Sequence, residues 1–206
     1  MTANGVPEGQ PEIVRRLDSV SASTLVDLVE AFEDLQMVLR CCERLVAELA
    51  VEGSEPDGVL VEAVWTMALL SYARCFSAGG TVVRLTEEDV KATQPDSDVL
   101  EWHQVLKRLR DHYTDPATNP RERFSVGVAQ DASGAASGVA ITSARQPLVD
   151  DLTVRQTGAI AYALSGLVNG RIEAQQAIVF EELKDTPEAD LEKLAPLDLA
   201  RPVTEP

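Results

Sequence analysis

Residues 25–49 read LVDLVEAFEDLQMVLRCCERLVAEL, and their apolar side chains recur at steps of three and four residues. That spacing is the period of an amphipathic helix, whose apolar stripe must be buried against another element. Ser23 or Thr24 can cap the start of this helix, and Gly53 follows its end. Such a helix is roughly 40 Å long, and helices of that length usually pack in bundles.

Two further helical stretches follow it along the chain. Residues from about 59 to 76 are apolar almost all round, which predicts a helix that is central in a bundle or lies at an oligomer interface. Gly79 and Gly80 should end it. A short helical turn starts at Thr86, with acidic residues in its first turn. Residues 95–98 then cap a third helix that runs to about Tyr113.

A final long helix is predicted from about 152 to 183. It contains Gly158, Gly166 and Gly170, each of which weakens a helix by about 1 kcal/mol relative to alanine. We therefore expect these glycines to mark close packing between helices.

One region has the alternation of a β-strand. Phe124, Val126 and Val128 alternate with small residues, a turn follows at 131–134, and Val139 and Ile141 come next. We predict a β-hairpin at about 121–146. The fold class is therefore mainly α, an up-and-down helical bundle with two long helices and an inserted β-hairpin.

The chain divides into a flexible tail at 1–11, a bundle domain at 12–184 and an acidic, proline-containing tail at 185–206 that we expect to be disordered. A short helix is expected over 12–17, at the start of the domain.

Composition limits the function classes. Aromatic residues make up only 4% of the chain, so its core must come from Leu, Val, Ala and Ile. The formal net charge of −16 repels phosphate backbones, which disfavours RNA as a partner without excluding a local basic patch.

The cysteines and the apolar segments bear on location. The three cysteines (Cys41, Cys42 and Cys75) lack the spacing of a metal site and predict reduced thiols in the core of a cytoplasmic protein. No signal peptide and no membrane-spanning segment are visible. We expect no metal, no cofactor and no membrane association.

Both histidines lie on the third helix. We expect its core face to be the stripe of Trp102, Leu106, Leu109 and Tyr113. His103 and Arg110 then lie together about 90° from that stripe, with Lys107 just beyond. His112 and Arg108 lie on the opposite flank. Each flank thus pairs an imidazole with a guanidinium.

These pairs also have structural explanations. His103 and Arg110 fit a solvated helix face or an interhelical salt bridge, and His112 fits favourable interaction with the helix dipole. Arg74 can pair with an acidic residue across the bundle.

Residues 69–77 read LLSYARCFS, and Trp102-His103 and Leu109-Arg110-Asp111 follow some 25 residues later. This arrangement resembles HEPN-type helical domains, the "higher eukaryote and prokaryote nucleotide-binding" group. The resemblance covers roughly 22–115 and the last helix. It implies a bundle, frequently dimeric, and in active members a metal-independent ribonuclease in which arginine and histidine from two protomers act on RNA.

Carried over to this chain, the resemblance assigns catalytic roles to Arg110 with His112 or His103, and ligand contacts to Lys107, Arg108, Arg74 and Tyr72. The histidine expected about six residues after Arg110 is replaced by Pro116. In favour of a phosphate ligand, residues 107–123 hold five basic and three acidic side chains, a local charge of +2.

The leading hypothesis is a non-catalytic HEPN-like module that acts through protein–protein contacts. It would be a homodimer paired through the apolar second helix, with an unidentified protein as a further partner. The alternative is an enzyme, a metal-independent HEPN-type endoribonuclease or nucleotide-binding protein. A second alternative is a small-ligand sensor with a pocket between helices and the hairpin as a lid.

Overall fold

The computed structural model describes residues 13–51, 53, 55–76, 83–94 and 98–197. The described helices are α1 (Val20–Leu49), α2 (Gly58–Arg74), α3 (Glu87–Thr93), α4 (Val99–Thr114), α5 (Asp151–Leu183) and α6 (Glu188–Leu191). The strands β1 (Glu122–Gln130) and β2 (Ala136–Arg145) lie between α4 and α5. The predicted mainly helical fold with an inserted hairpin is confirmed. The expected helix-ending glycines Gly79 and Gly80 lie outside the described residues.

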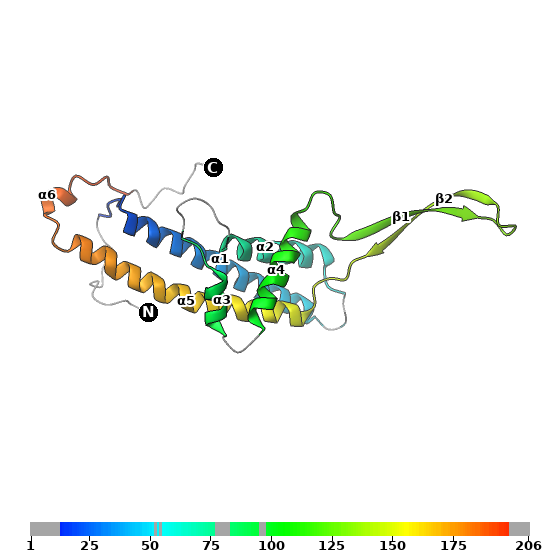
Figure 1. Ribbon diagram of the computed structural model, residues 1–206, viewed down its shortest axis with the longest axis horizontal. Helices are drawn as coiled ribbons and strands as arrows, with labels where there is room; N and C mark the ends of the chain where they lie inside the picture. The colour runs from blue at the N-terminus through cyan, green and yellow to red at the C-terminus, as the bar shows by residue number, and fades with distance from the viewer. Residues whose placement is uncertain (1–12, 52, 54, 77–82, 95–97, 198–206) are drawn as a thin grey trace.

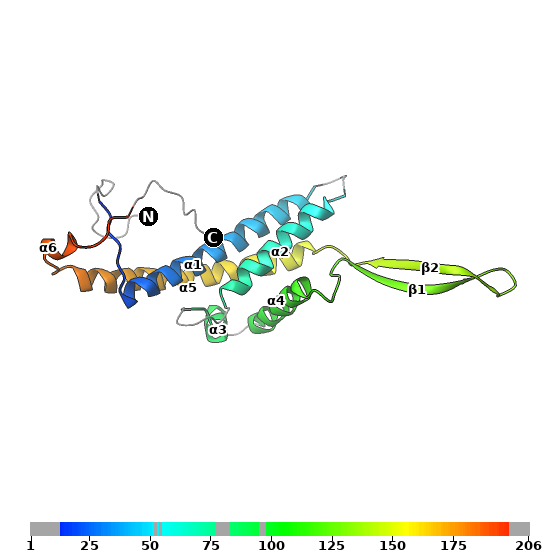
Figure 2. The same cartoon turned by 90° about the horizontal axis from the view of Figure 1, so that it is seen from above.

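The long helices form the body of the molecule. α1 packs chiefly against α5 and α2, and the chain runs in opposite directions in α1 and in each of these partners. α4 crosses α2 obliquely, and α3 packs beside the start of α4 (Figures 1 and 2). Ser19, rather than Ser23 or Thr24, caps α1, because its hydroxyl accepts a hydrogen bond from the Ala22 amide at 3.1 Å.

The core lies where α1, α2, α4 and α5 meet. Aliphatic residues supply most of it, as the low aromatic content predicts. Its largest fully buried side chains are Leu35, Leu45, Leu69, Tyr72, His103, Leu106 and Leu164. Cys41, Cys42 and Cys75 are free and buried, as expected. Burial raises the pKa of the Cys42 and Cys75 thiols to about 12, so both stay protonated at neutral pH.

The short helix α3 is fixed to α5 by a polar contact that the sequence pattern did not predict. Thr86 and Asp89 form a reciprocal capping box at the start of α3. The guanidinium of Arg171 on α5 pairs with the same Asp89 carboxylate. Burial raises the pKa of Asp89, but the hydrogen bonds from Arg171 and Thr86 outweigh burial and lower it overall.

The three glycines of α5 do not all mark close packing, which corrects the expectation. A Cβ atom at Gly158 would lie 3.5 Å from the Cβ of Cys42 on α1, an ordinary van der Waals contact. A Cβ atom at Gly166 or Gly170 would have nothing within 4 Å. Only Gly158 therefore sits at a helix–helix contact.

The segment after α5 also differs from the prediction. Residues 185–197 contain α6 and a stretch that lies beside residues 14–16, whereas we expected disorder from 185 onward. The amide of Arg16 donates to the Ala195 carbonyl at 2.8 Å, and the Arg15 guanidinium donates to the Leu194 carbonyl at 2.8 Å. Because residues 13–18 are non-helical in this pairing, the helix expected over 12–17 is wrong for the part that the structure describes.

The two strands form an antiparallel hairpin that extends away from the helices along the long axis of the molecule (Figure 1). Its turn is closed by Asp131, whose backbone carbonyl accepts from the Gly134 amide at 2.9 Å. Gly134 has a positive φ of 85°, a conformation that disfavours other residues. Among the described helices, none is long and apolar enough to cross a bilayer.

Candidate functional site

Helix α4 carries the predicted catalytic residues, but it faces the core differently from our expectation. Val99, His103 and Leu106 are its buried residues, whereas Trp102, Leu109 and Tyr113 are only half-buried. The inward face is therefore rotated by roughly 50° toward His103 and Arg110. The physical reason is a polar partner on α2, which makes burial of an imidazole favourable.

That partner is Tyr72. Its hydroxyl lies 2.8 Å from Nδ1 of His103, and the Phe76 ring lies over the imidazole with centroids 4.5 Å apart. Nε2 of His103 is buried and has no hydrogen-bond partner among the described residues. Burial, and then the charge of Lys107, lower the pKa of His103, so its neutral form is favoured. With 1% of its surface exposed, His103 does not reach solvent.

Arg110 is half-buried on the same face of α4. Its Nε lies 2.7 Å from Oδ1 of the neighbouring Asp111, a salt bridge whose alignment does not make a hydrogen bond. This contact is within one helix, so Arg110 is neither the solvated residue nor the interhelical bridge that the structural explanation predicts.

His112 points the other way. It is exposed in the last turn of α4, edge-on to the ring of Tyr113. Positions 103 and 112 are nine residues apart, which places them on opposite sides of the helix. The two histidines of one chain therefore do not converge. The location of His112 agrees with the helix-dipole explanation.

The basic residues near α4 are largely paired with acids. Lys107 Nζ lies 3.7 Å from Glu87, and Arg121 lies 3.5 Å from Glu62. Arg108 is exposed and has no ion-pair partner among the described residues. The +2 of residues 107–123 is thus offset by carboxylates from α2 and α3.

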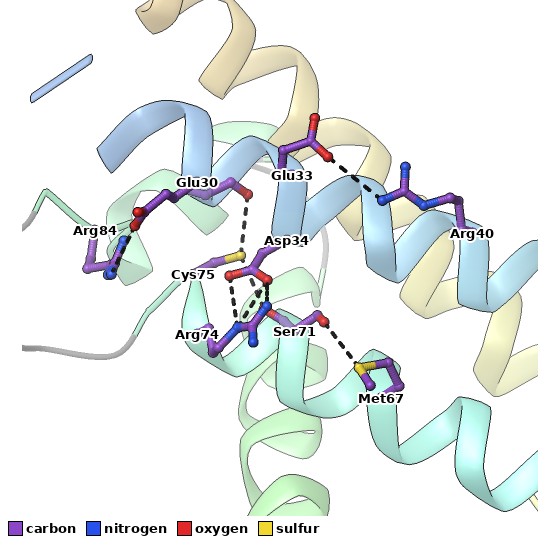
Figure 3. A network of polar contacts seen from close by, with 10 residues as sticks. Glu30, Glu33, Asp34, Arg40, Met67, Ser71, Arg74, Cys75 and Arg84 are labelled. Atoms are coloured by element: carbon purple, nitrogen blue, oxygen red, sulfur yellow. Dashed lines mark hydrogen bonds and ion pairs between the residues drawn. The ribbon is translucent and has the colours of Figure 1, made fainter. Parts of the chain in front are cut away.

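The two predicted ligand contacts on α2 point in different directions. Tyr72 faces the core, where its hydroxyl is hydrogen-bonded to His103. Arg74 lies outside, where its Nε donates to both carboxylate oxygens of Asp34 on α1 at 3.0 and 3.1 Å (Figure 3). The prediction that Arg74 pairs with an acid across the bundle is confirmed. The predicted catalytic and ligand-binding residues are therefore not assembled around one cavity.

The hairpin was predicted from its alternation, but the sequence pattern did not predict that its apolar face would be exposed. In the observed register Val126 lies opposite Ile141 and Val128 opposite Val139, so these side chains share one face with Phe124. We call the five residues Phe124, Val126, Val128, Val139 and Ile141 the apolar hairpin face. Each is exposed, Val139 by 75%. The opposite face holds small residues such as Gly127 and Ala140.

Helix α2 presents a second, weaker apolar surface. Most of its apolar residues face inward, among them Val61, Trp65 and Leu69. Its exposed side keeps a stripe of Val59, Ala63, Met67 and Leu70, which we call the outer α2 stripe. Contact with α1 and α4 thus explains why this helix is apolar nearly all round.

Hollows lie elsewhere in the part of the chain that the structure describes. One of about 460 Å³ lies at the root of the hairpin, and one of about 360 Å³ lies between the start of α4 and the first half of α5. His103, Arg110 and His112 line neither of them.

The comparisons with known proteins do not add an assignment. No protein-family model matches this chain, and neither a curated protein nor a solved structure is significantly similar to it.

Proposed function

We propose that this chain is a non-catalytic protein-contact module that forms a homodimer through its apolar hairpin face. The observation that supports this most directly is the set of five large apolar side chains, all exposed on one side of a ribbon. Clustered apolar surface of this kind marks interaction sites in soluble proteins. The HEPN-like resemblance stays a prediction and is not needed for the proposal.

An isolated two-stranded ribbon requires a cover to be stable. Such a hairpin is at best marginally stable in water unless more strands or a helix pack against it. Beyond its root, neither strand packs against any of the helices that the structure describes (Figures 1 and 2). The described residues of the same chain therefore do not supply the packing that would stabilise this face.

Charge permits a second copy to cover the hairpin. The whole chain carries −16, so two copies repel one another over most of their surfaces. Residues 121–146 hold three arginines and two acidic residues, a local charge of +1. The hairpin is thus a place where identical chains can approach without strong repulsion. A face that pairs with its own copy also satisfies two-fold symmetry.

The exposed area of the apolar hairpin face is comparable with that of a protein–protein interface. Five side chains that expose on the order of 100 Å² each supply more than half of the roughly 800 Å² per partner in a standard interface. Burying such a side chain contributes about 1.5–3 kcal/mol, and a dimer buries ten of them. That gross gain is large enough to offset the cost of association, about 4–15 kcal/mol.

Adjacent residues on opposite faces of β2 give a matched test. Ile141→Asp places a charge in the apolar hairpin face, and Thr142→Asp places the same charge on the other face of the same strand. Light scattering after size exclusion should give a dimer for the wild type and for Thr142→Asp, and a monomer for Ile141→Asp. Circular dichroism should show unchanged helix content in both variants.

Leu70→Asp tests the competing surface on α2. Loss of the dimer in Leu70→Asp, with a dimer retained in Ile141→Asp, would move the interface to the outer α2 stripe. A wild type that stays monomeric at millimolar concentration would overturn the homodimer altogether.

A further inference from the structure

The hollow at the root of the hairpin is lined both by helices and by the segments that connect them to the hairpin. Its walls come from the first half of α2, the end of α4, and the segments that lead into β1 and out of β2. Its volume of about 460 Å³ lies within the range of small-molecule sites, roughly 300–1,000 Å³. We call it the root hollow.

Aromatic and aliphatic side chains form its inner wall. Trp65 and Val61 on α2 are buried, and Leu148, in the segment between β2 and α5, also lines the hollow. Tyr113 is half-buried, and its hydroxyl has no hydrogen-bond partner among the described residues. Burial, and then the negative charge of Glu62, raise the pKa of Tyr113, so the hydroxyl is protonated at neutral pH.

A carboxylate lies beside these rings. The Glu62 side chain is 21% exposed, and its ion pair with Arg121 is long, at 3.5 Å. The Arg121 side chain is 66% exposed, so little packing holds it against Glu62. The other acids of the wall are occupied, because Asp57 caps α2 and Glu122 pairs with Arg145 at 3.2 Å.

We infer that the root hollow binds a small organic cation with an aromatic or apolar body. The cation would take the place of the Arg121 guanidinium on Glu62, and its body would lie against Trp65 and Tyr113. Cations are attracted to the faces of tryptophan and tyrosine rings. The net charge of −16 raises the local concentration of cations and lowers that of anions. This inference is independent of the homodimer proposal.

Three probes that share a phenethyl body test the charge preference by calorimetry at low ionic strength. Phenethylamine is a cation, phenethyl alcohol is neutral, and hydrocinnamate is an anion. Phenethylamine should bind and the anion should not. Binding of hydrocinnamate in preference, or of none of the three at millimolar concentration, would overturn the inference.

Two substitutions test the residues. Glu62→Gln should weaken the binding of phenethylamine by about tenfold or more, and tenfold corresponds to about 1.4 kcal/mol. Glu43→Gln, on the exposed side of α1, should leave the affinity unchanged. Arg121→Ala removes the internal competitor and should strengthen binding of the same probe. Unaltered binding in Glu62→Gln, in a variant with the wild-type melting temperature, would refute the site.

Discussion

The Tyr72 hydroxyl and Nδ1 of His103 lie 2.8 Å apart inside the bundle, and both side chains are buried. This hydrogen bond joins α2 to α4. Since a buried polar group without a partner costs its full desolvation free energy, the bond makes one face of α4 the favourable face to bury. It also removes from solvent one of the two histidines that could act in catalysis.

We expect Tyr72→Phe to lower the free energy of unfolding by about 1–3 kcal/mol, because Nδ1 of His103 then lacks its partner in the core. Urea unfolding followed by circular dichroism measures the change. Tyr162→Phe is the matched control, since Tyr162 is exposed on α5, and it should have no effect. Equal stabilities of the two variants would contradict a structural role for the bond.

His103 should make stability depend on pH. Its pKa in the folded protein is lowered from 6.5 by burial and by Lys107, whereas the unfolded chain keeps the ordinary value. Below about pH 6.5 the unfolded state therefore binds more protons than the folded state. The contribution of His103 to the free energy of unfolding is complete above that pH and is lost as the pH falls toward the pKa of His103 in the folded protein. The carboxylates with lowered pKa values titrate below 3.8, outside this window.

The check is thermal unfolding of the wild type and His103→Gln between about pH 8 and pH 5. The wild-type melting temperature should fall over this range, and that of His103→Gln should fall less. His112→Gln removes the exposed histidine and should keep the wild-type slope. If His103→Gln keeps the wild-type slope as well, His103 is not the group that titrates.

Periodicity predicted the helices α1, α2, α4 and α5 because it records which side chains are buried together, although the buried face of α4 was predicted wrongly. It did not place the start of α1. The turn from Val20 to Ser23 holds no buried residue and lacks an apolar stripe. The cap at Ser19 is a hydrogen bond between neighbours, which several serines and threonines nearby could equally have made.

The candidate site was less predictable for a related reason. Because histidine is polar, the apolar pattern places His103 outside the core face. The hydrogen bond with the Tyr72 hydroxyl, 31 residues away, makes its burial favourable instead. For the hairpin, the sequence predicted the strands but not the exposure of their apolar face. Its alternation was visible, but alternation normally implies a covered face, and no sequence pattern says that the described helices leave this face uncovered.

Two glycines of α5 offer a gain in stability. Gly166→Ala and Gly170→Ala add a methyl group where nothing lies within 4 Å, and alanine favours a helix by about 1 kcal/mol over glycine. Each should raise the free energy of unfolding by up to about 1 kcal/mol. Gly134→Ala should do the reverse in the hairpin turn, because its φ is positive. Urea unfolding of the three variants checks this; destabilisation by Gly170→Ala would mean that another molecule packs there.

We expect no metal-independent cleavage of RNA. The reaction would need an arginine at the phosphate and a histidine that takes the proton of the 2′-hydroxyl. In one chain His103 is buried, and His112 lies on the far side of α4 from it. Incubation with single-stranded and structured RNA in the presence of EDTA, analysed on denaturing gels, should leave both intact. Cleavage that is lost in Arg110→Ala but kept in Arg40→Ala would show that two chains assemble the site across their interface, and the module would then be an enzyme.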